Sequence, residues 1–435
     1  MLSGYDRKDG RKGVRNLIVV AYLVECARHV AERIAALSGR DDVHVIGFSG
    51  CAPCEYAERV MTALCTHPNV GVALVVSLGC ENFHRDELVE AVRASGREAA
   101  LVVIQDEGGT EKAIASGLAS VKRMSKAVDS AKRVPMDVSE LVVGTICGGS
   151  DAYSGKTANP AVGKVFDRLV DEGATCIFEE PGELIGCEEL LRARGATPET
   201  GDTLAATVAK ADAYYKKMGH DSISRGNFEG GLVSITEKSR GAYKKSGSRT
   251  STGIIKPGET PPTRGLWFMD VVPDGEAKWG FPNLSDTAEI VELASCGAHL
   301  VMYTTGRGSV AGCALVPVIK VCANPETFRR MADDMDVNAG VIATGERSEN
   351  DVAEELYGKV LEVANGAKSR PEALGHREFF LGYKSFECRP GNVARGGARV
   401  RPHWWSKSGG VTEFLVNCSP CDAQGTFKRT DATTW

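Results

Sequence analysis

The chain has 435 residues, of which 43% are hydrophobic and 25% are charged, and it carries a formal net charge of −5. This composition is ordinary for a soluble globular protein of two or three domains. The lack of a basic surplus argues against nucleic-acid binding, and no apolar run reaches the roughly 18 residues that a membrane helix needs. The charged segment from Met1 to Arg15 does not resemble a signal peptide, so we expect a cytoplasmic protein.

The first third of the sequence alternates short β-branched runs with amphipathic segments. The runs lie at 16–22, 43–48, 70–78 and 99–104, and helices are expected near 27–37, 57–65, 85–94 and 112–128. This alternation predicts a parallel sheet covered by helices. We expect a first α/β domain at residues 1–135. The polar stretch that follows the helix at 112–128 and ends at Ser139 is predicted to be the linker.

A second α/β domain is expected at residues 136–390. Its strand-like runs lie at 140–145, 175–179, 265–270, 299–303 and 317–321, with a helix near 161–171. Both domains are predicted to be Rossmann-like. The stretch 221–263, rich in Gly, Ser, Lys and Pro, is too long for an ordinary connection, so it is either disordered or functional. We favour a functional insertion, and we expect residues 391–435 to form an irregular tail.

Three cysteines fall where predicted strands end, namely Cys51, Cys80 and Cys147. Ligands of open α/β sheets bind outside the carboxyl ends of the strands, and three thiolates there would bind a soft or borderline metal. The alternative is that each is a small residue in a tight turn. Cys54 gives Cys51 a CxxC spacing, which is typical of redox or metal motifs but also arises from packing.

Two strand-end loops are candidate anion sites. Glycines allow close backbone approach, and the N-terminus of a following helix favours a carboxylate. In the second loop, Arg307 is expected to clamp a carboxylate in a bidentate manner. The candidate binding residues are Gly148, Gly149, Ser150, Asp151, Ser154 and Asn159 in the first loop, and Thr304, Thr305, Arg307 and Ser309 in the second.

Acid–base candidates lie in three further segments. Glu179 and Glu183 follow a predicted strand, Asp336 precedes Asn338 in an apolar context, and Lys238 lies in the insertion. Neighbouring carboxylates can raise one another's pKa for proton transfer or ligate a hard metal. The alternative for each charge run is a solvated face. Arg15 and Asn16, at the end of a charged N-terminal run, are candidates for binding the anion or for a surface role.

Other chemistries find little support. No two of the eight histidines stand at metal-ligand spacing, and there is no Walker A motif, no Gly-x-Gly-x-x-Gly after the first strand and no Gly-x-Ser-x-Gly elbow. Histidine-based zinc, kinase, dinucleotide and serine-hydrolase interpretations are therefore disfavoured.

Ordered motifs between Gly4 and Phe386 resemble the altronate/galactarate dehydratase family. They include Gly50-Cys51, Gly79-Cys80-Glu81, Cys147-Gly148-Gly149-Ser150-Asp151, Glu237-Lys238-Ser239, Thr304-Thr305-Gly306-Arg307-Gly308-Ser309 and Met335-Asp336-Val337-Asn338-Ala339-Gly340. The resemblance implies the second and C-terminal domains of that family. It also implies Fe²⁺-dependent loss of water from an aldonic or aldaric acid, which yields a 2-keto-3-deoxy acid. Whether the iron is mononuclear or part of an iron–sulfur cluster stays open.

Two departures from the family pattern affect substrate and partner. The small β-rich N-terminal module of the single-chain members is missing, so we expect a large subunit that binds a separate small subunit and forms a homo-oligomer. Gly47 stands where altronate and galactarate enzymes have a histidine, and the pattern is also similar to the large subunit of (2R)-sulfolactate sulfo-lyase. Elimination of sulfite is therefore an alternative, besides a sugar-acid-binding subunit without chemistry and an oxidoreductase built on Cys51 and Cys54.

Overall fold

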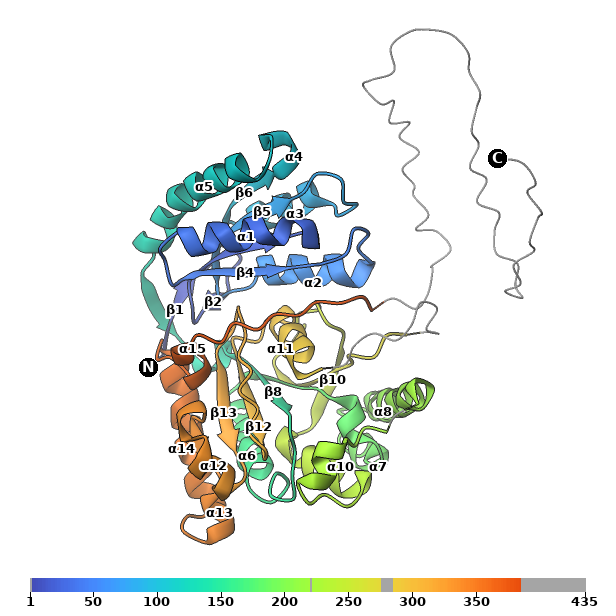
Figure 1. Cartoon of the computed structure of the whole chain (residues 1–435). Coiled ribbons are helices and arrows are strands. Elements are labelled where there is room, and N and C mark those ends of the chain that lie inside the picture. The colour runs from blue at the N-terminus through green and yellow to red at the C-terminus, as the bar shows by residue number, and fades with distance from the viewer. Residues whose placement is uncertain (1, 220, 275–284, 385–435) are drawn as a thin grey trace, which may run out of the picture. The chain divides into compact units, whose positions relative to one another are not determined.

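The computed structural model describes residues 2–219, 221–274 and 285–384. Residues 1–387 form one compact unit, and residues 388–435 form a second. All described residues belong to the first unit (Figure 1). The predicted tail from residue 391 lies outside the described residues.

A four-stranded parallel sheet of order β4-β3-β5-β6 lies in the first third of the chain. Its strands are β3 (Leu17–Tyr22), β4 (Val43–Gly47), β5 (Val70–Ser77) and β6 (Glu98–Val103). Successive side chains of β3 point to opposite faces of the sheet, as they do in any β-strand. Val19 and Ala21 join the core with α2 (Glu55–Cys65), whereas Ile18 and Val20 join the core with α1 (Glu25–Leu37). Helices α3 (Arg85–Ala94) and α5 (Thr110–Ser130) complete the layers.

The predicted linker near residue 135 is partly a strand. Residues Arg133–Met136 form β7, which pairs antiparallel with β1 (Leu2–Asp6), and β1 pairs with β2 (Lys12–Gly13). The stretch predicted to be a polar linker thus contains a strand, in which Val134 and Met136 pair with buried residues of β1. This small sheet carries the chain into the second α/β region.

The second sheet has seven parallel strands in the order β10-β11-β9-β8-β12-β13-β14. The strands are β8 (Val142–Cys147), β9 (Thr175–Phe178), β10 (Ser251–Ile255), β11 (Gly265–Met269), β12 (Leu300–Thr305), β13 (Val318–Cys322) and β14 (Val337–Asn338). The predicted α/β class with parallel sheets is therefore confirmed.

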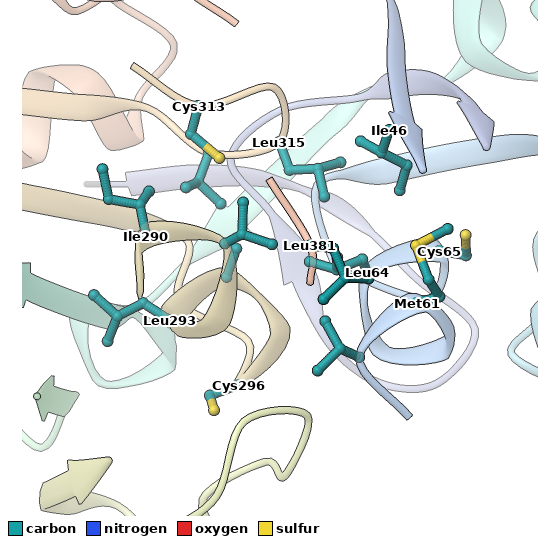
Figure 2. Packing of buried hydrophobic residues seen from close by; sticks show 14 of the residues in the cluster. Ile46, Met61, Leu64, Cys65, Ile290, Leu293, Cys296, Cys313, Leu315 and Leu381 are labelled. Atoms are coloured by element: carbon teal, nitrogen blue, oxygen red, sulfur yellow. The ribbon is translucent and has the colours of Figure 1, made fainter. Parts of the chain in front are cut away.

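Helices cover both faces of the seven-stranded sheet. Helices α6 (Ala158–Asp171) and α14 (Glu349–Ala364) pack on one face, and α11 (Asp286–Ser295) packs on the other between β8 and α2 (Figure 1). The side chains of α2 and α11 share one apolar core with Leu315 and Leu381 (Figure 2). The two sheets are thus joined by a common hydrophobic core.

The stretch 221–263 contains regular structure. Ser224 and Ser234 cap α9 (Arg225–Glu229) and α10 (Ile235–Tyr243) by accepting hydrogen bonds from Asn227 N and Glu237 N. A 3₁₀ turn (Lys244–Ser246) and β10 follow. The serine caps satisfy backbone donors at the helix starts, which explains why a Gly- and Ser-rich sequence is ordered here.

Other helices include α8 (Pro198–Met218), α7 (Glu188–Arg192), α12 (Pro325–Arg330), α13 (Val341–Thr344), α15 (Arg370–Leu374) and α4 (Ile104–Glu107). Among the described residues, no helix is long and apolar enough to cross a membrane.

Candidate functional site

The site lies where the strand order of the seven-stranded sheet reverses. From β8 the chain passes to β9 on one side and later to β12 on the other side. Loops that follow such a pair of strands diverge and leave a crevice at the carboxyl ends. The loop after β8 begins at Gly148, and the loop after β12 begins at Gly306.

Backbone hydrogen bonds hold these two loops together. Gly148 N donates to Thr304 O at 3.1 Å, and Gly306 N and Arg307 N donate to Gly149 O at 3.2 and 2.9 Å. A Cβ on Gly148 would lie 1.9 Å from Tyr303 Oη and 2.1 Å from Asp286 Oδ2. Only glycine therefore fits where the first loop crosses the Tyr303–Asp286 hydrogen bond of 2.5 Å.

The Asp151 carboxylate organises the first loop. Its Oδ1 accepts from Tyr153 N at 2.9 Å and from Ser154 N at 3.1 Å, and its Oδ2 accepts from Asn324 Nδ2 at 2.8 Å. A Cβ on Gly306 would lie 2.2 Å from this carboxyl group. Asp151 thus links the loops after β8, β12 and β13.

A cavity of about 420 Å³ opens between this first loop and α10. Five predicted site residues line it, namely Ser150, Asp151, Ser154, Asn159 and Lys238. Asn159 is fixed by Thr304, whose Oγ1 donates to Asn159 Oδ1 at 2.7 Å, and Asn159 Nδ2 donates to Gly241 O at 3.0 Å. The structure therefore brings the first predicted anion loop and the insertion into one cavity.

The cavity also contains cations that sequence reasoning missed. Lys156, Arg240 and Lys244 line it, together with Ser234 and Thr236. Lys244 Nζ donates to Gly155 O at 2.8 Å, whereas the charged groups of Lys156 and Arg240 make no hydrogen bond or ion pair with described residues. Lysines of the insertion were a sequence signal, but the sequence could not show that they face the β8 loop. A cationic wall lined by hydroxyl groups suits an anionic, hydroxylated ligand.

Lys238 connects the cavity to a buried group of acids. Its Nζ lies 2.7 Å from Glu183 Oε1 and also donates to Ser222 O. Glu183 Oε2 is buried and has no hydrogen-bond partner among the described residues. Burial raises the pKa of Glu183, against the opposing effect of Lys238. The pair therefore lies where a proton can pass between an amine and a carboxylate.

Behind this pair lie three further carboxylates. Oxygen atoms of Glu179, Glu180 and Glu289 all lie within 4.8 Å of one another, and all three residues are buried. Burial, together with the charge of Glu289, raises the pKa of Glu179 well above its ordinary value, and burial raises the pKa of Glu289 to about 8. Glu180 has a φ of 70°, the left-handed region that favours glycine. Glu289 was not among the predicted residues, because its helix position gave no sequence signal.

Cys147 lies beside this acidic group. It is buried, and Lys245 Nζ lies 3.2 Å from its Sγ and contacts Glu180 Oε2. Burial raises the pKa of the Cys147 thiol, although Lys245 opposes the shift. Glu180 Oε2 also accepts from Cys147 N at 2.9 Å.

The other two predicted thiolate ligands lie on the first sheet. Cys51 and Cys80 follow β4 and β5, both are exposed, and Asn82 N donates to Cys51 O at 2.8 Å. The sulfur atoms of Cys51, Cys80 and Cys147 do not form a group within 4.8 Å of one another. The three thiols therefore do not converge as expected, because two follow strands of one sheet and the third follows a strand of the other.

The second predicted anion loop serves mainly to support the first. Thr305 Oγ1 accepts from Gly308 N and Ser309 N, both at 3.0 Å. Arg307 Nη1 donates to Gly226 O at 2.5 Å and pairs with Glu229 at 3.1 Å. Arg307 therefore anchors α9 beside the site, and it is not one of the residues that line the cavity.

Four other candidates lie outside the cavity and contact protein groups. Arg15 makes a bidentate pair with Glu372 at 2.8 Å. Asn16 Oδ1 accepts from Arg7 Nη1 at 2.9 Å. Asp336 accepts from Lys320 N at 2.8 Å and from Arg370 N at 3.0 Å, and Asn338 Oδ1 accepts from Gly340 N at 3.0 Å. These contacts fix the four side chains within the protein, and their roles in substrate binding or catalysis stay predictions.

Comparison with known proteins agrees with this architecture. The C-terminal domain of D-galactarate/altronate dehydratases matches residues 138–386, and the second domain of D-galactarate dehydratase/altronate hydrolase matches residues 4–129. Together the two matches cover both parallel sheets.

Three relatives show how far the likeness extends. The (2R)-sulfolactate sulfo-lyase subunit beta of Chromohalobacter salexigens is 34% identical over 87% of this chain and 96% of that protein. The galactarate dehydratase (L-threo-forming) of Escherichia coli is 33% identical over 84% of this chain and 73% of that protein. The altronate dehydratase of Bacillus subtilis is 29% identical over 87% of this chain and 76% of that protein. These matches show that the chain is a lyase of the D-galactarate/altronate dehydratase family.

Proposed function

We propose that this chain eliminates a β-leaving group from a small anionic hydroxy acid, and that the first candidate reaction is loss of water from a sugar acid such as galactarate or altronate. The observation that carries the proposal is the cationic cavity of about 420 Å³ at the strand-order reversal, with the Lys238–Glu183 pair at its wall. Names of the relatives, which are dehydratases and a sulfo-lyase, support β-elimination.

The cavity side chains can orient such a substrate. Lys156 and Arg240 supply cationic groups for carboxylates. Ser150 and Thr236 supply hydroxyl groups that can donate to, or accept from, the substrate hydroxyls. The buried loop residues Asp151 and Asn159 hold this wall in place through their own hydrogen bonds.

Lys238 is the proposed base in the proton-transfer step. Its Nζ lies 2.7 Å from Glu183, which can take up the proton that Lys238 must lose before it acts as a base. Lys238 takes the proton from the α-carbon, the electrons of the C–H bond form the Cα=Cβ double bond, and the Cβ–O bond breaks. The leaving hydroxyl group keeps the electron pair of that bond, takes the proton held by Glu183 and departs as water. The resulting enol then becomes a 2-keto-3-deoxy acid.

We propose that the reaction uses Fe²⁺. The cysteine set does not fit a single ion, because the three sulfur atoms do not converge, whereas the buried carboxylates of Glu179, Glu180 and Glu289 do converge. When bound, a divalent cation would supply Lewis acidity toward oxygen atoms of the substrate. These three side chains would hold it.

Release of sulfite and pyruvate from (2R)-sulfolactate is the second candidate function. It is favoured by the 96% coverage of the sulfo-lyase subunit beta, compared with 73% and 76% of two dehydratases. Lys156 and Arg240 also provide two cations without an ion pair among the described residues, which match one carboxylate and one sulfonate. In that case the C–S bond breaks and sulfite departs with the electron pair.

The test is to incubate the full chain anaerobically with Fe²⁺ and, separately, with galactarate, altronate and sulfolactate. Keto-acid and sulfite assays identify the leaving group. We expect Lys238→Met to lose turnover by about 10²–10⁴-fold, the usual contribution of a general base, while Lys164→Met, at an exposed position in the middle of α6, retains it. Absence of elimination from every substrate, with and without a small subunit, would refute the proposal.

A separate small subunit is also proposed. The relative described as subunit beta supports it, because that name implies a partner. The proposal predicts that a co-expressed small subunit of the sulfo-lyase type will co-purify with this chain and increase its turnover. A homo-oligomeric state stays a prediction that analytical ultracentrifugation can test.

A further inference from the structure

Three buried carboxylates meet near Glu183, the residue that pairs with Lys238 of the cavity wall. Glu179 and Glu180 follow β9, and Glu289 lies on α11. One oxygen of each lies within 4.8 Å of the others, and the side chains belong to residues that are 0%, 4% and 7% exposed. Among the residues that the structure describes, this is the one such group of potential metal ligands.

Glu179 has no partner for either of its carboxylate oxygens. Oε1 and Oε2 are both buried, and neither has a hydrogen-bond partner within the described part of the chain. Buried polar atoms in folded proteins are almost always paired, because an unpaired one has lost its hydration without replacement. An ion of opposite charge would replace that hydration.

Each nearby ammonium group already contacts one carboxylate. Lys238 pairs with Glu183, and Lys384 pairs with Glu292 at 2.5 Å. Lys245 contacts Glu180 and the sulfur of Cys147. In the described part of the chain, neither Glu179 nor Glu289 contacts an ammonium or guanidinium group. One ammonium group, that of Lys245, therefore contacts this group of three carboxylates, and the other two carboxylates have no contacting cation among the described residues.

We propose that Glu179, Glu180 and Glu289 together bind one divalent cation. Carboxylate oxygens suit Mg²⁺, Mn²⁺ and Fe²⁺, and three protein ligands leave positions for water or substrate oxygen atoms. A catalytic role for the ion rests on the proposed function, in which Glu183, three residues after Glu180, holds Lys238 at the cavity. Binding of the ion does not depend on that function.

The experiment measures cation binding without turnover. The full chain is stripped with chelator and titrated with Mn²⁺, which is followed by electron paramagnetic resonance, and metal content after desalting is measured by mass spectrometry. We expect one equivalent per chain. Glu179→Gln and Glu289→Gln should each weaken Mn²⁺ binding by at least about 10–100-fold, the loss already caused by removing outer-shell partners.

Two controls separate this site from its alternatives. Cys147→Ser and the double variant Cys51→Ser/Cys80→Ser should bind Mn²⁺ and Fe²⁺ within about twofold of the wild type, since sulfur is not the expected donor. Glu292→Gln, on the same helix but outside the group, should do likewise. Far-UV circular dichroism of each variant establishes that it folds.

The wild type alone provides a second measurement. Mn²⁺ should raise its melting temperature in proportion to the logarithm of the ion concentration above the dissociation constant, and Glu179→Gln should lose this shift. No binding by the wild type at millimolar Mn²⁺, or retention by both glutamine variants, would overturn the inference. Binding without elimination would leave it standing and refute the proposed function instead.

Discussion

The Nζ of Lys320 lies 3.4 Å from the centroid of the Tyr303 ring on the neighbouring strand. It is completely buried and has no hydrogen-bond partner among the described residues. Burial lowers the pKa of Lys320 to about 7, although Asp286, Glu378, Asp336 and Asp334 all act to raise it. The face of the Tyr303 ring is therefore the nearest group that attracts the positive charge of the Lys320 ammonium.

Replacing Lys320 with Met should stabilise the protein at low pH. The pKa of about 7 in the folded protein lies below the ordinary 10.5, so the unfolded chain binds more protons between these values. The cost of burying the ammonium is fully present below pH 7 and disappears as pH rises toward 10.5. Lys320→Met should raise the free energy of unfolding at pH 6 by about 1–4 kcal/mol.

Urea denaturation at pH 6, 8 and 10 measures this effect. The advantage of Lys320→Met over the wild type should shrink as pH rises. Lys359→Met, on the exposed side of α14, is the matched control and should show no such trend. An advantage of Lys320→Met that stays constant with pH would contradict the prediction.

Gly148→Ala should lower both stability and turnover. The new methyl group would meet Tyr303 Oη at 1.9 Å and Asp286 Oδ2 at 2.1 Å, so it would break their hydrogen bond or move the loop. Overpacking of this kind costs about 1–3 kcal/mol. Gly358→Ala in α14 has no heavy atom within 4 Å, and this control should be neutral or stabilising. Thermal melting of both variants measures the two stability changes, and an unchanged melting temperature for Gly148→Ala would contradict the prediction.

Arg240→Gln and Lys156→Met should raise KM with little change in kcat, because both cations bind substrate charge that is present before and after proton transfer. The increase should be roughly ten- to hundredfold for each, as expected for hydrogen bonds to charged groups. A larger increase for a dianionic than for a monoanionic substrate would show that both cations bind charge. Equal kinetics for variant and wild type would exclude these side chains from binding.

Alkylation should divide the cysteines by burial. Cys26, Cys51 and Cys80 are exposed, whereas Cys147 and Cys176 are buried and burial raises the pKa of both thiols. Iodoacetamide at pH 7.5 should label the exposed group within minutes and the buried pair only after denaturation. Peptide mapping by mass spectrometry identifies each site. Rapid labelling of Cys147 in the folded chain would contradict its placement.

Much of the fold could be predicted because strands buried on both faces are recognisable as short apolar runs. The first sheet and strands β8, β9, β11, β12 and β13 follow the predicted segments closely. Helix α8 was missed although Thr197 and Pro198 form a standard N-terminal signal. Strands β1, β2 and β7 are too short and polar to show a periodicity.

The candidate site was only partly predictable. Sequence reasoning identified three residues that line the cavity, Ser150, Ser154 and Asn159, because they follow a predicted strand. A position just after a parallel strand indicates a ligand-binding loop. Glu289 was missed, because an acidic residue on an amphipathic helix usually faces solvent and burial is a tertiary property. The role predicted for Asp336 stays a prediction. Its carboxylate accepts hydrogen bonds from the backbone amides of Lys320 and Arg370, and such contacts leave no trace in the sequence.

The apolar core that α11 shares with α2 has a practical consequence for protein production. A recombinant fragment ending near residue 135, or one beginning there, would expose the side chains that now meet across that core, including Leu64 on one fragment and Leu293 on the other. Such fragments should aggregate when expressed separately and become soluble when co-expressed. The two family domains are therefore better treated as halves of one folding unit than as independent modules.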